Sequence, residues 1–218
     1  DLASESFGFM DWRDGTVAGV TARVFRISFT GEMSYEVNVP AHYGRHVWEQ
    51  LIEAGAEFNI TPYGTETMHV LRAEKGFIIV GQDTDGSMTP ADMNMNWVVG
   101  KNKAFSFIGK RSLERSDSIR ENRKQLVGLK TLEPSAVLPE GAQIVDDPNQ
   151  PIPMAMQGHV TSSYYSASLD HSIALAVVKG GLNRMGDIVY CPAADGSSIA
   201  AEIVSSVFYD PAGERQHV

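Results

Sequence analysis

Apolar and polar residues alternate in two neighbouring segments near the start of the chain. Residues 24–29 place apolar side chains at every second position, and residues 35–39 alternate again before Pro40 stops the pattern. A period of two is typical of strands with one apolar face. Residues 30–32 between them have turn composition, so the pattern predicts a β-hairpin. Residues 13–15 (Arg-Asp-Gly) carry a further turn signal before it.

The spacing then changes to that of helices. Apolar residues at intervals of one and four predict a helix over 42–54, which Gly55 ends. A second helix is expected from Thr65 through Arg72, and the apolar run 77–80 predicts a short buried strand.

Two further helices are expected before the pattern changes again. Thr89-Pro90 opens one of them, since Pro is favoured at the first helical position, and a charged helix ends near Asn122. Beyond it, short strand-like segments separated by Gly, Pro, Asp and Asn predict a small antiparallel barrel or sandwich. These segments are 125–129, 142–145, 159–163, 173–178, 187–190 and 199–207. The chain is therefore predicted to divide into an α+β part (1–120) and an all-β part (123–218).

Composition and charge narrow the classes of partner. The chain has 218 residues with 18 Lys and Arg against 27 Asp and Glu, a formal net charge of −9. This balance argues against a nucleic-acid-binding protein, which needs basic surface. No apolar run approaches the roughly 20 residues that span a bilayer, and no signal peptide is visible. The single cysteine, Cys191, excludes an internal disulfide and favours the cytosol. The first residue is Asp rather than Met, which we interpret as a cut or processed chain.

Few residues carry an obvious chemistry. Asp83, Asp85 and Gly86 resemble the start of a calcium loop, but Asn94 stands where the closing carboxylate should be, and the six histidines lack ligand spacing. No metal site is therefore predicted. Glu36 is more suggestive, because a carboxylate in an alternating strand can accept two parallel N–H donors from a guanidinium or an amino-pyrimidine. The alternative interpretation is a solvated residue on the outer face of the hairpin.

Four segments together resemble a known family. Residues 25–37 are similar to its "R-x-x-Y-T-G-E-x-G-x-E" hairpin, and residues 71–90 to its "L-R-x-E-x-G…G-x-D-x-D…T-P" block. Residues 107–113 match "F-x-G-K-x-x-L", and residues 158–176 match a segment of its barrel. This is the folate-dependent aminomethyltransferase family, the T-protein of glycine cleavage and its relatives. Within it, the chain most resembles the C-terminal part of the α subunits of heterotetrameric sarcosine oxidases.

The resemblance implies a fold and a function. The fold is α+β, a T-protein-like C-terminal half in which a folate-binding subdomain precedes a small antiparallel β-barrel. The function is to bind tetrahydrofolate as acceptor of the one-carbon unit when sarcosine is oxidised to glycine, giving 5,10-methylene-tetrahydrofolate. FAD, FMN and NAD are expected only in other parts of the intact enzyme, and other subunits of a hetero-oligomeric sarcosine oxidase are the expected partners.

The resemblance also assigns candidate folate-binding residues. Glu36 matches the family glutamate that holds the pterin edge, and Phe29 stands where the family has tyrosine, so the ring remains and the hydroxyl is lost. Glu32 lies in the same turn, and Trp97 closes a Met-rich segment that is expected either in the core or as a ligand wall. Arg215 is a candidate contact for the anionic folate tail.

Two departures from the family leave roles open. Met68 replaces an arginine that many T-proteins carry, and the aspartate thought to assist proton transfer would lie upstream of this chain. No catalytic residue is therefore expected in it, and we expect the fragment alone to be inactive.

Other functions remain open at this point. Dimethylglycine and sarcosine dehydrogenases and glycine cleavage aminomethyltransferases share much of the pattern. A methyltransferase of this fold that acts on a sulfonium compound is also compatible, as is a module that only docks other subunits. Folate-binding proteins that assist iron–sulfur cluster assembly carry a Lys-Gly-Cys motif. This chain has Phe77 after Lys75 and Gly76, which argues against that alternative.

Overall fold

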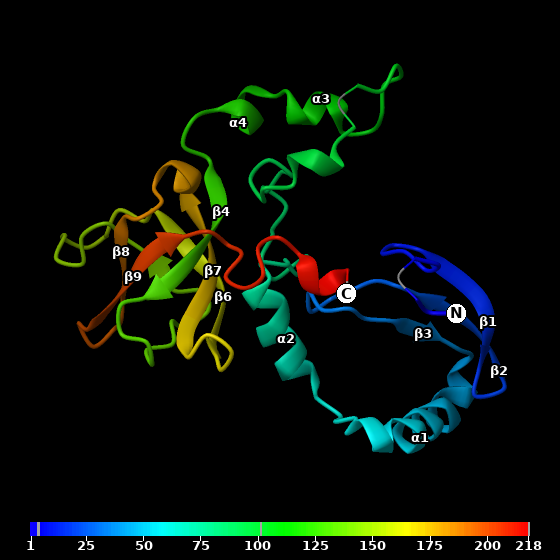
Figure 1. Ribbon diagram of the computed structural model, residues 1–218. Coiled ribbons are helices and arrows are strands. Elements are labelled where there is room, and N and C mark those ends of the chain that lie inside the picture. Colours follow the sequence, from blue (N-terminus) through cyan, green and yellow to red (C-terminus); the bar gives the residue numbers. More distant parts are fainter. Residues whose placement is uncertain (4, 101, 218) are drawn as a thin grey trace. The chain divides into compact units, whose positions relative to one another are not determined.

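The computed structural model describes residues 1–3, 5–100 and 102–217. The chain forms two compact units (Figure 1). The first unit consists of Asp1–Arg72 together with Asp210–Val218, and the second consists of Ala73–Tyr209. The division into domains 1–120 and 123–218 stays a prediction.

A three-stranded antiparallel sheet forms the centre of the first unit. Its strands are β1 (Trp12–Val17), β2 (Val20–Phe25) and β3 (Glu36–Asn38), in that order. The turn predicted at residues 13–15 is wrong, because those residues belong to β1. The chain reverses instead at Ala18 and Gly19, which both have positive φ, as two-residue hairpin turns of the right twist require.

The predicted hairpin is present, with shorter strands and a longer connection. β2 and β3 pair antiparallel, with Arg23 opposite Asn38 and Phe25 opposite Glu36. The first strand ends at Phe25 because the next residue, Arg26, turns inward: its side chain is buried and donates to the backbone oxygen of Phe7 at 2.6 Å. The turn within the connection is held by Ser28, whose hydroxyl oxygen accepts the Gly31 N–H at 2.8 Å.

Both helices predicted before residue 75 are confirmed. The 3-10 helix η1 (Ala41–Tyr43) leads into α1 (Gly44–Gly55), and the 3-10 helix η2 (Ala56–Phe58) follows. α2 (Thr65–Glu74) extends two residues beyond its predicted end. Another 3-10 helix, η5 (Glu214–Gln216), lies near the end of the chain.

The segment 77–80 is not a strand, contrary to the prediction. The Asp83 carboxylate accepts the Ile79 N–H at 2.8 Å and also binds the hydroxyl groups of Thr161 and Ser162 at 2.5 and 2.7 Å. The Ile79 carbonyl in turn accepts the N–H groups of Gln82 and Asp83, so both backbone groups of Ile79 are satisfied within a turn and not by a neighbouring strand.

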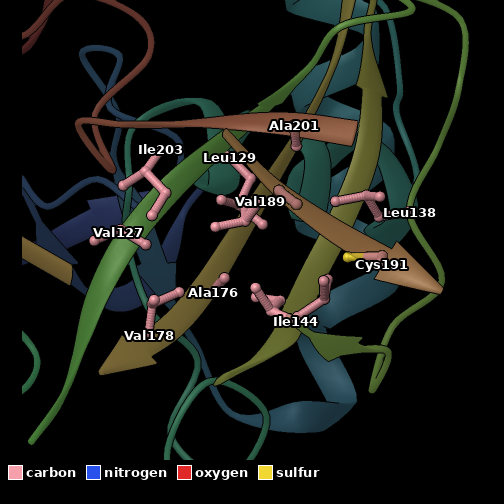
Figure 2. Packing of buried hydrophobic residues seen from close by; sticks show 12 residues of the cluster. Val127, Leu129, Leu138, Ile144, Ala176, Val178, Val189, Cys191, Ala201 and Ile203 are labelled. Atoms are coloured by element: carbon pink, nitrogen blue, oxygen red, sulfur yellow. The ribbon is translucent and has the colours of Figure 1, made fainter. Parts of the chain in front are cut away.

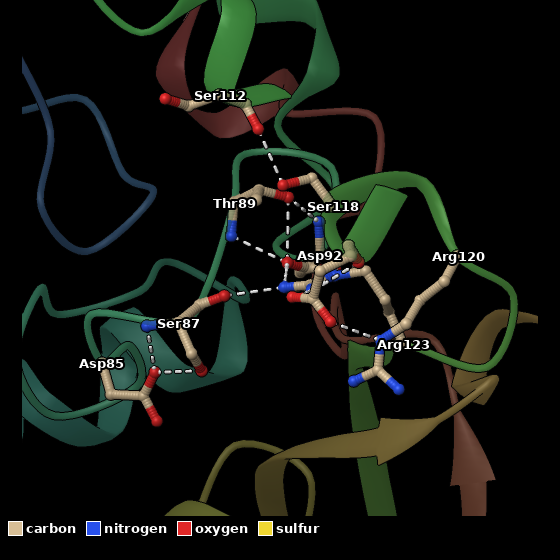
Figure 3. A network of polar contacts seen from close by, with 9 residues as sticks. Asp85, Ser87, Thr89, Asp92, Ser112, Ser118, Arg120 and Arg123 are labelled. Carbon is tan, nitrogen blue, oxygen red and sulfur yellow. Dashed lines mark hydrogen bonds and ion pairs between the residues drawn. The ribbon is translucent and has the colours of Figure 1, made fainter. Parts of the chain in front are cut away.

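Between residues 89 and 122, the helix predicted to open at Thr89-Pro90 does not form, and the charged helix predicted to end near Asn122 is divided into two short helices. That region holds the 3-10 helix η3 (Asn96–Val98) and two short helices, α3 (Lys110–Leu113) and α4 (Ser116–Ile119). At the predicted start, the Asp92 carboxylate accepts both the N–H and the hydroxyl of Thr89, at 2.7 and 2.9 Å, and closes a tight turn (Figure 3).

The same carboxylate anchors this region to the first barrel strand. Arg123 donates to the two Asp92 oxygens at 2.7 and 2.6 Å and to the backbone oxygen of Ser87 at 2.6 Å. Both charged side chains are largely buried, at 11% and 3% exposure. The network therefore ties the turn at residues 87–92 to the strand that begins at residue 124 (Figure 3).

All six strands predicted for the C-terminal part are present, and they form a barrel. The strand order is β5-β6-β7-β4-β9-β8, and every pair is antiparallel. Val145 and Tyr190 bring the two edges together by exchanging backbone hydrogen bonds of 2.9 Å each. The bounds are β4 (Lys124–Thr131), β5 (Gln143–Ile144), β6 (Gly158–Ser166), β7 (His171–Lys179), β8 (Ile188–Pro192) and β9 (Ser198–Val204), with the 3-10 helix η4 (Gly181–Asn183) after β7.

Aliphatic side chains from the strands fill the barrel (Figure 2). Val127 and Leu129 of β4, Val189 of β8 and Ile203 of β9 are fully buried in this core. Successive side chains of a strand point to opposite faces, so Val127 and Leu129 enter this core, whereas Leu126 packs in a second buried cluster.

Two further properties bear on function. In the part of the chain that the structure describes, no helix has the length and apolarity needed to cross a bilayer. Among the same residues, no group of three or more His, Cys, Asp and Glu side chains is arranged to hold a metal ion.

Candidate functional site

Glu36 projects from the exposed face of the three-stranded sheet. It and Asn38 are exposed, whereas Val37 between them is half-buried, so Glu36 and Val37 lie on opposite faces of the sheet. The Asn38 side-chain amide donates to Glu36 Oε1 at 3.0 Å and thereby holds the carboxylate in one orientation. Sequence reasoning missed Asn38, although a spacing of two along a strand places both residues on one face.

The arrangement leaves the carboxylate able to bind a ligand. An ionised carboxylate offers about four acceptor positions on its two oxygens. Asn38 occupies one of them, and the exposed side chain of Glu36 keeps others accessible. Glu36 can therefore accept a pair of parallel N–H donors from a planar group.

Two aromatic residues lie in the same cross-strand row as Glu36. Trp12 pairs with Phe25 across β1 and β2, and Phe25 pairs with Glu36 across β2 and β3. The ring centroids of Trp12 and Phe25 are 6.4 Å apart, and the Arg23 guanidinium lies 4.2 Å from the indole centroid. Sequence reasoning missed this row because it did not predict β1.

Arg23 is itself fixed by an acidic neighbour in the next row. Its Nε and Nη2 atoms donate to the two oxygens of Asp14 at 2.8 and 3.0 Å. These hydrogen bonds lower the pKa of Asp14 and raise that of Arg23. A hollow of about 530 Å³ lies on this part of the sheet, within the size range of small-molecule sites. It is lined by Asp14, Thr21, Ala22, Arg23, Phe25, Asn38 and Pro40.

The structure brings two of the predicted folate-binding residues together. Arg215 of η5 forms an ion pair with Glu32 at 3.2 Å, and both side chains remain about half exposed. The η5 backbone is held by Asp210, whose carboxylate accepts the N–H groups of Glu214 and Arg215 at 3.0 and 3.2 Å. Phe29, in the same unit, is 42% exposed.

Trp97 and Met68 complete the set of positions that the sequence singled out. Trp97 lies on η3 in the second unit, and its side chain is 80% exposed. Met68, on α2, is half-buried. The folate-binding roles of Glu36, Phe29, Glu32, Trp97 and Arg215 stay predictions.

Family models match both parts of the chain. The model of the GCVT N-terminal domain matches residues 1–103, and that of the glycine cleavage T-protein C-terminal barrel domain matches residues 124–210. Because the two models belong to one family and occur here in order, they account for nearly the whole chain.

Individual relatives agree with the family models. The chain is 48% identical to the sarcosine oxidase subunit alpha of Corynebacterium sp. (strain U-96), over 99% of this chain and 22% of that protein. It is 33% identical to an aminomethyltransferase of Halothermothrix orenii, over 80% of this chain and 46% of that protein. The chain thus spans about a fifth of the sarcosine oxidase subunit and about half of the aminomethyltransferase.

A solved structure supports the same fold. The crystal structure of glycine cleavage system aminomethyltransferase T from Bartonella henselae matches with a TM-score of 0.80 over 96% of this chain and 55% of that chain. The sequence identity is 23%, so the likeness concerns the fold alone. The predicted α+β class with an antiparallel barrel is confirmed.

Proposed function

Because this chain belongs to the glycine cleavage T-protein family, we propose that its first unit binds tetrahydrofolate, with Glu36 accepting the N–H donors of the amino-pyrimidine edge. The observation that carries this proposal is the exposed carboxylate that Asn38 holds at 3.0 Å on the face of the sheet. A positioned carboxylate recognises a planar pair of donors more tightly than a freely rotating one, because less rotational freedom is lost on binding.

The anionic tail of folate requires a basic contact. The net charge of −9 provides no general attraction for it, so the contact has to be local. Arg215 is the candidate, and its half-exposed ion pair with Glu32 keeps the guanidinium at the surface. In this proposal Glu32 forms an ion pair with Arg215 and does not contact the pterin.

The reaction context that we propose is oxidation of sarcosine to glycine in a longer, hetero-oligomeric protein. The 48% identity to a sarcosine oxidase subunit, against 33% to an aminomethyltransferase, favours this context over glycine cleavage. When bound, tetrahydrofolate supplies the acceptor for the one-carbon unit. The residues of this chain bind and orient it, and oxidation at FAD, FMN or NAD belongs to other parts of the assembly.

Subunit docking is a second function that the surface favours. The second unit exposes large apolar side chains within a short stretch, among them Trp97, Phe105 and Ile108. Exposed apolar side chains gathered in one region favour a protein interface. This function is compatible with folate binding by the first unit.

The experiment is a calorimetric titration of the 218-residue chain with 5-formyl-tetrahydrofolate. Glu36→Ala should weaken binding about tenfold or more, since it leaves the pterin donors without their charged acceptor. Glu57→Ala is the matched control, because Glu57 is exposed on η2 in the same unit. Equal affinities of the wild-type chain and Glu36→Ala would contradict the assignment.

A further inference from the structure

The second unit carries an exposed arm, residues 96–100 and 102–122, which contains η3, α3 and α4 and leads into the first barrel strand (Figure 1). None of these described residues is buried, and most are exposed. We propose, on the basis of the hetero-oligomeric context and the docking function above, that the arm binds an acidic protein surface on another subunit. Its hollow receives an apolar side chain of that partner, and its basic residues pair with the surrounding carboxylates.

Large apolar side chains of the arm face solvent. Trp97, Phe105 and Ile119 are 80%, 67% and 68% exposed, and Ile108 is fully exposed. Single exposed apolar residues are normal on a protein surface, but several of them in one segment mark an interaction site. The helices α3 and α4 have four residues each, so neither is long enough to bury an apolar face of its own.

A hollow in the arm provides room for a side chain of the partner. It has a volume of about 750 Å³, and its apolar lining includes Phe107, Ile108 and Leu113. Two basic residues, Lys103 and Arg115, line the same hollow. The Lys103 ammonium lies 5.2 Å from the centroid of the Phe107 ring, which holds the charge beside the apolar surface. This hollow therefore fits a partner that presents an apolar side chain next to carboxylates.

The charge of the arm is opposite to that of the whole chain. Residues 96–122 contain six Lys and Arg against three Asp and Glu, a formal charge of +3, whereas the chain carries −9. One of the three acidic residues, Asp117, already pairs with Arg120 and Arg123 at 2.9 and 3.0 Å. Among the described residues, no acidic side chain forms an ion pair with Lys110 or Arg115. The arm thus attracts an acidic surface.

Other occupants fit the arm less well. An anionic membrane or a nucleic acid is repelled by the net charge of −9, and a membrane surface also favours long amphipathic helices, which the described part of the arm lacks. Permanent burial within the same polypeptide does not suit so many Lys and Arg residues, because domain cores exclude them. An interface between subunits combines an apolar centre with a charged rim, as the arm does.

The experiment is carbodiimide cross-linking of the intact hetero-oligomer, with the linked peptides identified by mass spectrometry. This reagent joins a lysine amine directly to a carboxylate, without a spacer, so it reports ion pairs. Lys103 and Lys110 should link to Asp or Glu residues of another subunit. Lys130 is the matched control and should not link, because it is exposed on β4 of the same unit, outside the arm.

Substitutions separate charge from apolar contact, with subunit association measured by analytical ultracentrifugation. Arg115→Glu should weaken association about tenfold or more at low salt and Arg115→Gln less, and both effects should shrink at high salt. Ile108→Ser should weaken association at both salt concentrations, since salt does not screen apolar contact. Lys130→Glu and Leu132→Ser are the matched controls, because both residues are exposed in the same unit outside the arm.

The outcomes separate the acidic partner from docking itself. Links from Lys103 and Lys110 only to the same polypeptide or to a second copy, or the absence of any link, would overturn the inference. Binding of the 218-residue chain to phosphatidylserine vesicles that Arg115→Glu abolishes, with subunit association unchanged, would overturn it in favour of a membrane. Weaker association in Ile108→Ser with no effect of Arg115→Glu would leave docking intact and overturn the acidic partner.

Folate binding is tested separately on the same variants. Arg115→Glu and Ile108→Ser should bind 5-formyl-tetrahydrofolate like the wild-type chain, and Glu36→Ala should keep the subunits together. A free arm in an intact hetero-oligomer would overturn this inference and leave folate binding untouched. Purification of the protein without any other subunit would contradict both this inference and the proposed hetero-oligomeric context.

Discussion

The local sequence pattern predicts on which face of a strand some side chains lie, but not others. The orientation of Glu36 follows from alternation along the strand. Asn38 follows from the same rule. Trp12 could not be placed in this way, because the exposed and mostly polar strand β1 lacks an apolar face that sequence reasoning could detect. Its partners became visible only with the register of the sheet.

The fold determines the reactivity of Cys191. It lies on β8 in the barrel core, 3% exposed, and burial raises the pKa of its thiol to about 12. We therefore predict that Cys191 does not react with a disulfide reagent at about pH 8 in the native chain, since the thiolate is the nucleophile. The same assay in guanidinium chloride is the control and should titrate one thiol per chain. Rapid reaction of the native chain would contradict the buried position.

At the scale of elements, the barrel strands could be predicted and the segments between the two parts could not. All six strands have apolar positions bounded by turn residues, and that pattern is local. The apolar run 77–80 predicts a strand, and Thr89-Pro90 predicts the start of a helix. In the structure, Asp83 accepts the Ile79 N–H and Asp92 accepts the Thr89 N–H. Thr161 and Arg123, which are distant in sequence, hold these two carboxylates in place.

The contact of Asp92 with Arg123 makes the second unit sensitive to acid (Figure 3). Burial acts to raise the pKa of Asp92, but the hydrogen bonds from Arg123 and Thr89 outweigh it and hold the pKa below its ordinary value of 3.8. A carboxyl whose pKa is lowered by folding contributes stability above its unfolded pKa. That contribution is lost as the pH falls through the folded value.

We predict that Asp92→Asn lowers the free energy of unfolding by about 3 kcal/mol at pH 7, because it removes the buried charge partner of the largely buried Arg123. The difference from wild type should shrink as the pH falls below 3.8. Urea denaturation of the wild-type chain and of Asp92→Asn, at pH 7 and at a pH below 3.8, measures this difference in the free energy of unfolding. The control is Asp117→Asn, because Asp117 binds the same Arg123 but is 70% exposed and should contribute less than about 1 kcal/mol. Equal effects of the two substitutions would count against the role of burial.

At the scale of the molecule, the order of the motifs predicts the family and its fold. Which segments of the chain make up each of the two units could not be predicted from the sequence. Residues 210–218 belong to the first unit although they follow the barrel in sequence. Arg26 contributes to this arrangement by donating to the backbone oxygen of Gln216 at 3.2 Å. A contact across 190 positions leaves no periodic signal, so only tertiary structure reveals it.

The central claim is that Glu36 recognises the amino-pyrimidine edge of folate. The measurement that tests it most directly is the ratio of dissociation constants for tetrahydrofolate and its 2-desamino analogue, in the wild-type chain and in Glu36→Gln. The wild-type chain should bind the analogue about tenfold more weakly, because one donor to the carboxylate is missing, whereas Glu36→Gln should bind both ligands within about twofold. Equal binding of the two ligands by the wild-type chain, or an undiminished preference in Glu36→Gln, would contradict the claim.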